Sequence, residues 1–378
     1  MHKLTITPSV ESVARKYAMM LLPDARTNAA PVYDYKSKVI WLRDELSRGK
    51  AYVKDGKSRM KKAQLKPYID YLDKIIAEYD KLLVVRPGTR GWLDYERDFT
   101  SLLDEKALAK IVHYITIDTR KKKPTITKHN VPFHEAIVEM MGYKKLQKYV
   151  FPSIIEELGI KTCVYCNAQY AIVVDDHTSL FQLDHCLPKS IYPYLCTSFY
   201  NLQPCCGSCN QRKLNEEMRY GTNKEYNLSI WQSPIDPHQD DNFHFHIDDA
   251  NLALYVIAAT SHDKNLLKMQ YVAHVNPAQE DKDLLKIVEQ RFHITDQYNR
   301  ILDVVEETVW KHQIYSAGYI RSLNNAIGKM FPDMKGQVRR IITGTYDGSD
   351  NIYKRPLTKM IHDVIDQLDG LKKKRVIP

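Results

Sequence analysis

The most constraining feature of this sequence is the placement of its cysteines. All seven lie between residues 163 and 209, and four of them form two Cys-x-x-Cys pairs, CVYC and CGSC. Two residues between thiolates allow one tight turn to direct both sulfurs at one ion, and two such turns complete a tetrahedral zinc site. The sequence therefore predicts a structural zinc ion held by Cys163, Cys166, Cys206 and Cys209.

The remaining three cysteines are not needed for this site. Disulfides would be more dispersed along the chain and would leave one of seven thiols unpaired, so metal binding is favoured over a disulfide framework. Cys205 is an alternative ligand, although its spacing to Cys209 is less regular. Cys186 and Cys196 are interpreted as small buried hydrophobic residues.

Composition narrows the class of protein. Hydrophobic residues make up 44% of the 378 residues and charged residues 27%, which is typical of a folded chain rather than a disordered one. The first residues lack the basic and then apolar pattern of a signal peptide, and no apolar run approaches the length of a membrane span. We therefore expect a cytoplasmic protein with no membrane partner.

The formal net charge of +9 is concentrated near the N-terminus. Residues 1–160 carry 30 Lys and Arg against 20 Asp and Glu, whereas residues 216–378 carry 21 against 23. The N-terminal part could bind a polyanion through its phosphates, with the basic segments 54–62, 86–91 and 120–130, predicted as loops, as candidate contacts. The same excess could equally serve solubility alone.

Local patterns divide the chain into three regions and indicate a mostly α-helical α+β protein. Residues 1–158 form a basic N-terminal region with helical periodicity, seen in the apolar stripe of 65–85. Residues 7–22 offer Thr7 as an N-cap and Pro8 at the first helical position. Residues 159–220 hold the cysteines, and residues 221–378 form an α-rich C-terminal region with a small β element.

The shorter elements are predicted from their residue types. Residues 169–176 and 179–185 are expected to form a β-hairpin, and residues 211–220 are compatible with a helix. Residues 243–248 and 251–258 are expected to form a small sheet, followed by helices from about residue 280.

A polar constellation lies between and after the two cysteine pairs. LDHCLPKS (183–190) places an acidic residue beside a histidine, and FYNLQPCCGSCNQRK (199–213) follows with Asn-Leu, the second cysteine pair, an asparagine and basic residues. This order resembles the HNH, or ββα-metal, endonucleases in their zinc-stapled form. The resemblance covers roughly residues 160–216 and implies a central ββα-metal domain held together by the four-cysteine zinc site.

The resemblance implies a role for each polar residue. His185 would be the general base, because imidazole titrates near neutral pH. Asp184 and Asn210 would bind one catalytic Mg²⁺ or Mn²⁺ ion, and Asn201 would fix the loop that follows His185 through hydrogen bonds to backbone. Arg212 or Lys213 would contact a substrate phosphate. Many members have His at the position of Asn210, and the asparagine oxygen favours Mg²⁺ or Mn²⁺ over softer metals.

Two functions follow as hypotheses. The first is a metal-dependent endonuclease acting on double-stranded DNA, of the kind found in bacterial anti-phage defence or restriction, with an ATPase or other defence protein as partner. The second is a zinc-stapled nucleic-acid-binding or scaffold subunit with a vestigial site. Taken singly, Asp184 could be a turn residue, His185 a core histidine and Asn210 a helix cap; taken together, they favour the nuclease. His177 is expected to be a surface residue without a role.

Overall fold

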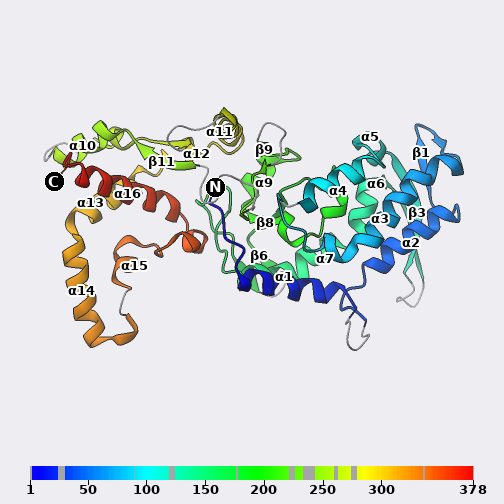
Figure 1. Ribbon diagram of the computed structural model, residues 1–378, viewed down its shortest axis with the longest axis horizontal. Coiled ribbons are helices and arrows are strands. Elements are labelled where there is room, and N and C mark those ends of the chain that lie inside the picture. Colours follow the sequence, from blue (N-terminus) through cyan, green and yellow to red (C-terminus); the bar gives the residue numbers. More distant parts are fainter. Residues whose placement is uncertain are drawn as a thin grey trace.

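The protein has an elongated shape with the cysteine-rich region at its centre. In Figure 1 most of the N-terminal helices lie at one end of this computed structural model and most of the C-terminal helices at the other, whereas the first helix lies near the centre. Buried apolar side chains from all three regions form one continuous core. The structure describes residues 2–23, 30–88, 90–118, 124–175, 178–220, 226–232, 243–258, 263–273, 279–334 and 337–377.

Helices dominate the N-terminal region. Helix α1 (Pro8–Leu21) begins where predicted, because the Thr7 hydroxyl accepts a hydrogen bond from the Val10 N–H (3.4 Å). Helix α3 (Lys66–Leu82) confirms the apolar stripe and lies beside α2 (Lys36–Ser47). The other helices of this region are η1 (Lys62–Leu65), α4 (Arg90–Thr100), α5 (Glu105–Leu108), α6 (Phe133–Met140), α7 (Tyr143–Tyr149) and α8 (Phe151–Glu157).

The helical prediction for this region is incomplete, because it also contains a four-stranded antiparallel sheet. The strand order is β2-β1-β3-β4, formed by β1 (Tyr52–Asp55), β2 (Ser58–Arg59), β3 (Ile111–Asp118) and β4 (Thr125–Pro132). Strands β1 and β2 form a hairpin within the basic segment 54–62, which the sequence predicted as a loop. Gly56 allows this turn, because its φ of +61° lies in the left-handed region.

The described part of the central region contains two short strand pairs, two short 3-10 helices and one α-helix. Strand β5 (Val173–Asp175) pairs with β6 (Thr178–Ser179), and β7 (Gln182–His185) pairs with β8 (Leu202–Cys205). The predicted hairpin is therefore correct only for β5 and β6. Strand β7 pairs instead with β8, which places Leu183 beside Pro204 on a face where both are buried. The loop between β7 and β8 contains η2 (Pro193–Leu195) and η3 (Phe199–Asn201).

Helix α9 (Gly207–Lys213) occupies a different range from the helix predicted at 211–220. It begins earlier because Cys206 is its N-cap and accepts a hydrogen bond from the Cys209 N–H at 3.5 Å. It ends at Lys213 because Leu214 has a φ of +54°, which a helix cannot continue. The predicted helix is wrong beyond this point, since β9 (Arg219–Tyr220) pairs with β10 (Tyr226–Asn227).

The C-terminal region confirms one predicted strand and corrects another. Strand β11 (Phe243–Ile247) pairs with β12 (Met269–Ala273), but residues 251–258 are largely helical, in α10 (Asp249–Ile257). The Asp248 carboxylate starts this helix by accepting a hydrogen bond from the Asn251 N–H (3.0 Å). The helices that follow are η4 (Lys264–Leu267), α11 (Gln279–Phe292), α12 (Ile294–Tyr298), α13 (Leu302–Ile314), α14 (Ala317–Met330), η5 (Pro332–Met334), α15 (Val338–Thr343), η6 (Ser349–Lys354) and α16 (Thr358–Lys373).

None of the helices in the described part of the chain has the length and apolar character needed to span a bilayer.

Candidate metal centre and adjoining polar cluster

The two cysteine pairs meet at one point of the structure. Their four Sγ atoms all lie within 4.8 Å of one another and all four residues are buried. Tetrahedral coordination with zinc–sulfur bonds of about 2.3 Å places sulfurs about 3.8 Å apart, so this cluster fits a zinc ion without rearrangement of the backbone. The quartet is the predicted one: Cys163, Cys166, Cys206 and Cys209.

The other three cysteines stand apart from this quartet. The Cys205 Sγ contacts the Gln182 carbonyl oxygen (3.5 Å), and the Cys196 Sγ lies 3.7 Å from the Met141 sulfur. Burial raises the pKa of all three thiols, that of Cys186 to about 12. None of the three belongs to the cluster of four sulfurs in the described part of the chain. This agrees with the interpretation of Cys186 and Cys196 as small buried residues.

Asp184 belongs to a polar cluster that joins strand β7 to helix α9. Its carboxylate accepts a hydrogen bond from the Tyr165 hydroxyl and lies 3.1 Å from the Lys213 ammonium. The Lys213 ammonium also donates to the His185 carbonyl oxygen (2.8 Å). Asp184 and Lys213 are 6% and 1% exposed, so each charge depends on the other for neutralisation.

Asn210 belongs to the same polar cluster, one helical turn before Lys213. Its side-chain amide donates to the Gln182 Oε1 (2.6 Å), and Gln182 precedes Asp184 by two residues on β7. Residues two apart on a strand share a face, as do residues three apart on a helix. Asp184 and Asn210 therefore both lie where β7 faces α9, and each is bonded to a protein partner.

The oxygen atoms of Asp184 and Asn210 are of the kind that bind hard divalent cations. Asp184 offers carboxylate oxygens, and the amide of Asn210 donates to Gln182, which leaves the Asn210 carbonyl oxygen as a ligand atom. Oxygen ligands of this kind are preferred by Mg²⁺ and Mn²⁺. The Lys213 ammonium, however, already provides a positive charge beside Asp184.

His185 lies at the end of β7 and has a separate set of partners. Its Nε2 is 3.0 Å from the Cys196 carbonyl oxygen, and its ring centroid is 4.6 Å from that of Tyr143. It is only 5% exposed, and burial, together with nearby Lys189, lowers its pKa to about 3. The imidazole is thus neutral and largely shielded from water in this conformation.

Asn201 fixes the loop that follows His185. Its Oδ1 accepts a hydrogen bond from the Leu187 N–H (2.7 Å), and its Nδ2 donates to the carbonyl oxygens of Leu187 and Leu195, both at 3.1 Å. Asn201 is completely buried. These are side-chain bonds to backbone, of the kind that the resemblance implied for this residue.

Arg212 does not belong to the polar cluster of Asp184, Asn210 and Lys213. Its guanidinium donates to the Phe292 carbonyl oxygen (3.2 Å) at the end of α11, so in this structure it links α9 to the C-terminal region. His177, the other histidine considered from the sequence, lies outside the described residues.

Sequence patterns did not single out three side chains that surround the site. The Tyr165 hydroxyl bonds Asp184 and also accepts from the Gln203 amide (2.6 Å). The Lys189 ammonium lies 4.6 Å from the Tyr143 ring centre, against which the His185 ring also packs. Tyr165 lies within the first cysteine pair and Lys189 within LDHCLPKS, so their positions in these motifs could have indicated that they lie near the site. No sequence pattern indicated this for Tyr143, which is distant in sequence.

Comparison with known proteins gives one partial likeness. No protein-family model matches the chain, and no solved structure matches it significantly. The chain is 35% identical over 57 residues to the Septu protein PtuB of Bacillus thuringiensis. These residues are 15% of this chain and 21% of that protein, so the chain spans about a fifth of the length of the curated relative that it matches.

Proposed function

We propose that this chain is a metal-dependent HNH endonuclease that hydrolyses DNA phosphodiester bonds in an anti-phage defence system. The observation that carries the proposal is the polar cluster between β7 and α9, where Asp184, Asn210 and Lys213 gather beside the four cysteines. The likeness to a Septu protein supports the defence role.

The residues of this polar cluster would bind and neutralise the substrate phosphate. Asp184 and Asn210 would hold a Mg²⁺ or Mn²⁺ ion, which when bound supplies positive charge to the scissile phosphate and the leaving oxygen. The Lys213 ammonium would then exchange its contact with Asp184 for one with a phosphate oxygen. Such an exchange keeps both buried charges compensated.

His185 would take a proton from the attacking water. Donation of the Nε2 proton to the Cys196 carbonyl fixes the tautomer and leaves the lone pair on Nδ1, which is the atom that would accept the proton. A buried imidazole with a pKa of about 3 is a weak base, so water must first gain access to the ring. Access would also return its pKa toward the ordinary value of about 6.5.

The partners follow from charge and from the same likeness. Double-stranded DNA is the proposed substrate, and the basic N-terminal region would contact its backbone. A second protein of the defence system, such as an ATPase, would open the shielded site.

Two observations favour the second hypothesis, a zinc-stapled nucleic-acid-binding subunit with a vestigial site. Lys213 already neutralises Asp184, and His185 is almost inaccessible. A subunit of this type would keep its zinc and bind DNA without cutting it.

Plasmid nicking separates the two functions. The protein, purified with any protein that binds it, is incubated with supercoiled DNA and Mg²⁺ or Mn²⁺. We expect His185→Asn to lower the nicking rate by about 100-fold or more, as expected for loss of a general base. The control is His293→Asn, at an exposed position whose φ of +50° suits asparagine. Equal rates for wild type and His185→Asn would contradict the nuclease proposal.

A further inference from the structure

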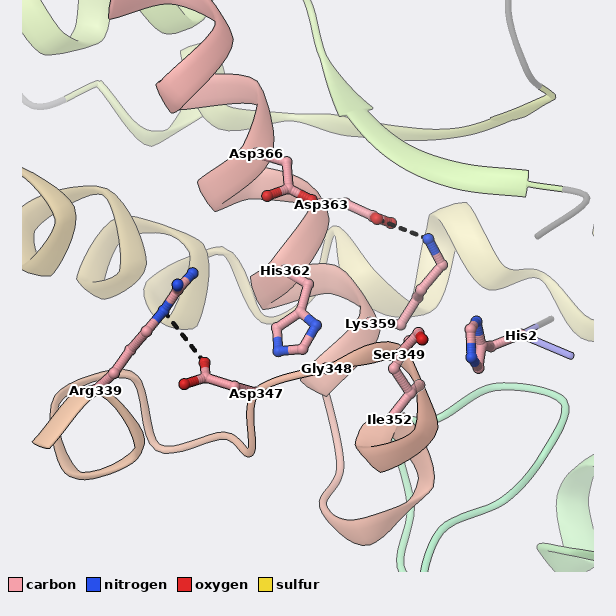
Figure 2. Close-up of a pocket in the computed structure, with 10 residues that line it drawn as sticks. All are labelled: His2, Arg339, Asp347, Gly348, Ser349, Ile352, Lys359, His362, Asp363 and Asp366. Atoms are coloured by element: carbon pink, nitrogen blue, oxygen red, sulfur yellow. Dashed lines mark hydrogen bonds and ion pairs between the residues drawn. The ribbon is translucent and has the colours of Figure 1, made fainter. Parts of the chain in front are cut away.

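The C-terminal region contains two cavities that share one side chain. Figure 2 shows the first, of about 310 Å³, in which charged groups pair with one another. The Arg339 Nε lies 3.2 Å from Asp347, and the Lys359 ammonium lies 2.6 Å from Asp363. These pairs compensate each other's charges and Asp366 adds a further acidic group, so the first cavity has no surplus positive charge for an anionic ligand.

The second cavity, of about 350 Å³, lies among helices α13, α14, α15 and α16. A volume of this size is typical of small-molecule sites. It is lined by Thr308, Lys311, His312, Tyr315, Ser316, Ala317, Ile320, Arg321, Arg339, Ile342, Thr343, Ile365, Asp369 and Lys372.

The charges of the second cavity are unbalanced toward positive. Arg321 and Lys372 make no ion pair with any described residue. Arg339 approaches Asp347 through Nε, and Figure 2 shows its two terminal nitrogens directed away from that carboxylate. The single acidic lining residue, Asp369, is 2.9 Å from the His312 Nε2. The cavity therefore presents cationic donors that an anionic ligand could satisfy.

The remaining lining is apolar enough to hold an uncharged planar group. Ile320, Ile342 and Ile365 come from three different helices, and Tyr315 adds an aromatic ring. Guanidinium groups recognise phosphate oxygens in two-bond geometry, and aromatic faces stack on nucleobases. A ligand with a phosphate at one end and a heterocyclic base at the other matches both parts of this lining.

We propose that this cavity binds a nucleoside monophosphate. Arg321, Lys372 and the terminal nitrogens of Arg339 bind its phosphate, and Tyr315 with the isoleucine side chains contacts its base. None of Asp184, Asn210 and Lys213 lines this cavity. The binding of a nucleotide here can therefore be tested independently of the nuclease activity.

The test is calorimetric titration of the full chain with AMP, GMP, CMP and UMP. Divalent cations are omitted, so that a phosphate does not report on a metal site. Adenosine and inorganic phosphate are titrated as controls for the two halves of the ligand. The variants are Arg321→Gln and Lys372→Gln, with Lys329→Gln on α14 and Lys373→Gln on α16 as matched exposed controls outside the cavity.

We expect saturable binding of at least one nucleotide at one site per chain. Loss of a charged hydrogen-bond donor should weaken it about tenfold or more in Arg321→Gln and Lys372→Gln, with partial recovery in Arg321→Lys. The two control variants should bind within about twofold of wild type. Circular dichroism checks that both cavity variants are folded. The proposal would be overturned by the absence of saturable binding, by equal affinity for adenosine and AMP, or by unchanged affinity in both folded cavity variants.

Discussion

The ammonium of Lys213 lies 3.1 Å from a carboxylate oxygen of Asp184, and both side chains are buried between β7 and α9. The proposed metal ligand Asp184 and the proposed phosphate contact Lys213 therefore also form a buried ion pair. In such a pair the cost of desolvating each charge is offset only while the partner is present. Loss of either charge should therefore lower the free energy of unfolding, which can be measured without any substrate.

Replacement of Lys213 by methionine should destabilise the fold by about 3–5 kcal/mol, because Asp184 is left as an uncompensated buried charge. The measurement is the free energy of unfolding in urea. The exposed pair of Lys66 with Asp70 (2.6 Å) provides the control, since Lys66→Met should cost less than about 1 kcal/mol. The double variant Lys213→Met with Asp184→Asn should recover part of the loss; no recovery would show that the charges are not coupled.

Metal analysis of the purified protein should find about one zinc ion per chain, bound through the four-cysteine cluster. Cys206→Ser should lose zinc and lower the melting temperature, because the cluster joins the turn before β5 to the start of α9. Cys205→Ser is the matched control, since this neighbouring residue lies outside the cluster and should keep its zinc. Zinc loss from both variants alike would move the ligand assignment away from Cys206.

The sequence was sufficient for the metal centre because its signal is local. Each cysteine pair forms its own turn, so spacing alone predicted all four sulfurs of the cluster. The strand predicted at residues 251–258 was wrong because the apolar signal there is ambiguous. A short apolar run does not distinguish a strand from a helix. The distinguishing feature was Asp248, an N-cap residue directly before the segment.

The contacts of Asp184, Lys213 and His185 could not be predicted from the sequence and became apparent only in the three-dimensional structure. A lysine near the end of a short helix is usually exposed, and nothing in the local sequence indicated that Lys213 would lie against Asp184. The pairing of β7 with β8 created that arrangement, whereas the sequence favoured pairing with the nearer strand. The Tyr143 ring beside His185 likewise depends on packing of the N-terminal region.

Stability should fall as pH is lowered below about 6.5, partly through His362. Burial lowers the pKa of this histidine, whose Nε2 is bonded to the Tyr346 carbonyl oxygen (2.9 Å), beside the first cavity. The unfolded chain binds a proton at the ordinary pKa while the folded chain resists it, so acidification favours unfolding. Unfolding free energies of wild type and His362→Gln at pH 7.5 and 5.5 test this: the variant should lose less. An equal loss would assign the pH dependence to other groups.

Asn167 joins the metal centre to the last helix, and two substitutions separate its side-chain bonds from its backbone preference. Directly after Cys166, its Nδ2 donates to Thr162 and to the Ile352 carbonyl oxygen, and its Oδ1 accepts from the Lys359 N–H at the start of α16 (3.0, 3.0 and 3.1 Å). Its φ of +50° lies in the left-handed region, which asparagine and glycine tolerate better than alanine.

Asn167→Gly should lower the unfolding free energy by about 2–3 kcal/mol through loss of these buried hydrogen bonds. Asn167→Ala loses the same bonds and must also hold alanine in the left-handed region, so it should be less stable than the glycine variant by about 1 kcal/mol. Urea denaturation of both variants, with zinc content measured in parallel, gives this ordering. If alanine were as stable as glycine, the positive φ would not be a constraint at this position. If both matched wild type, the side-chain bonds would not anchor α16 to the metal centre.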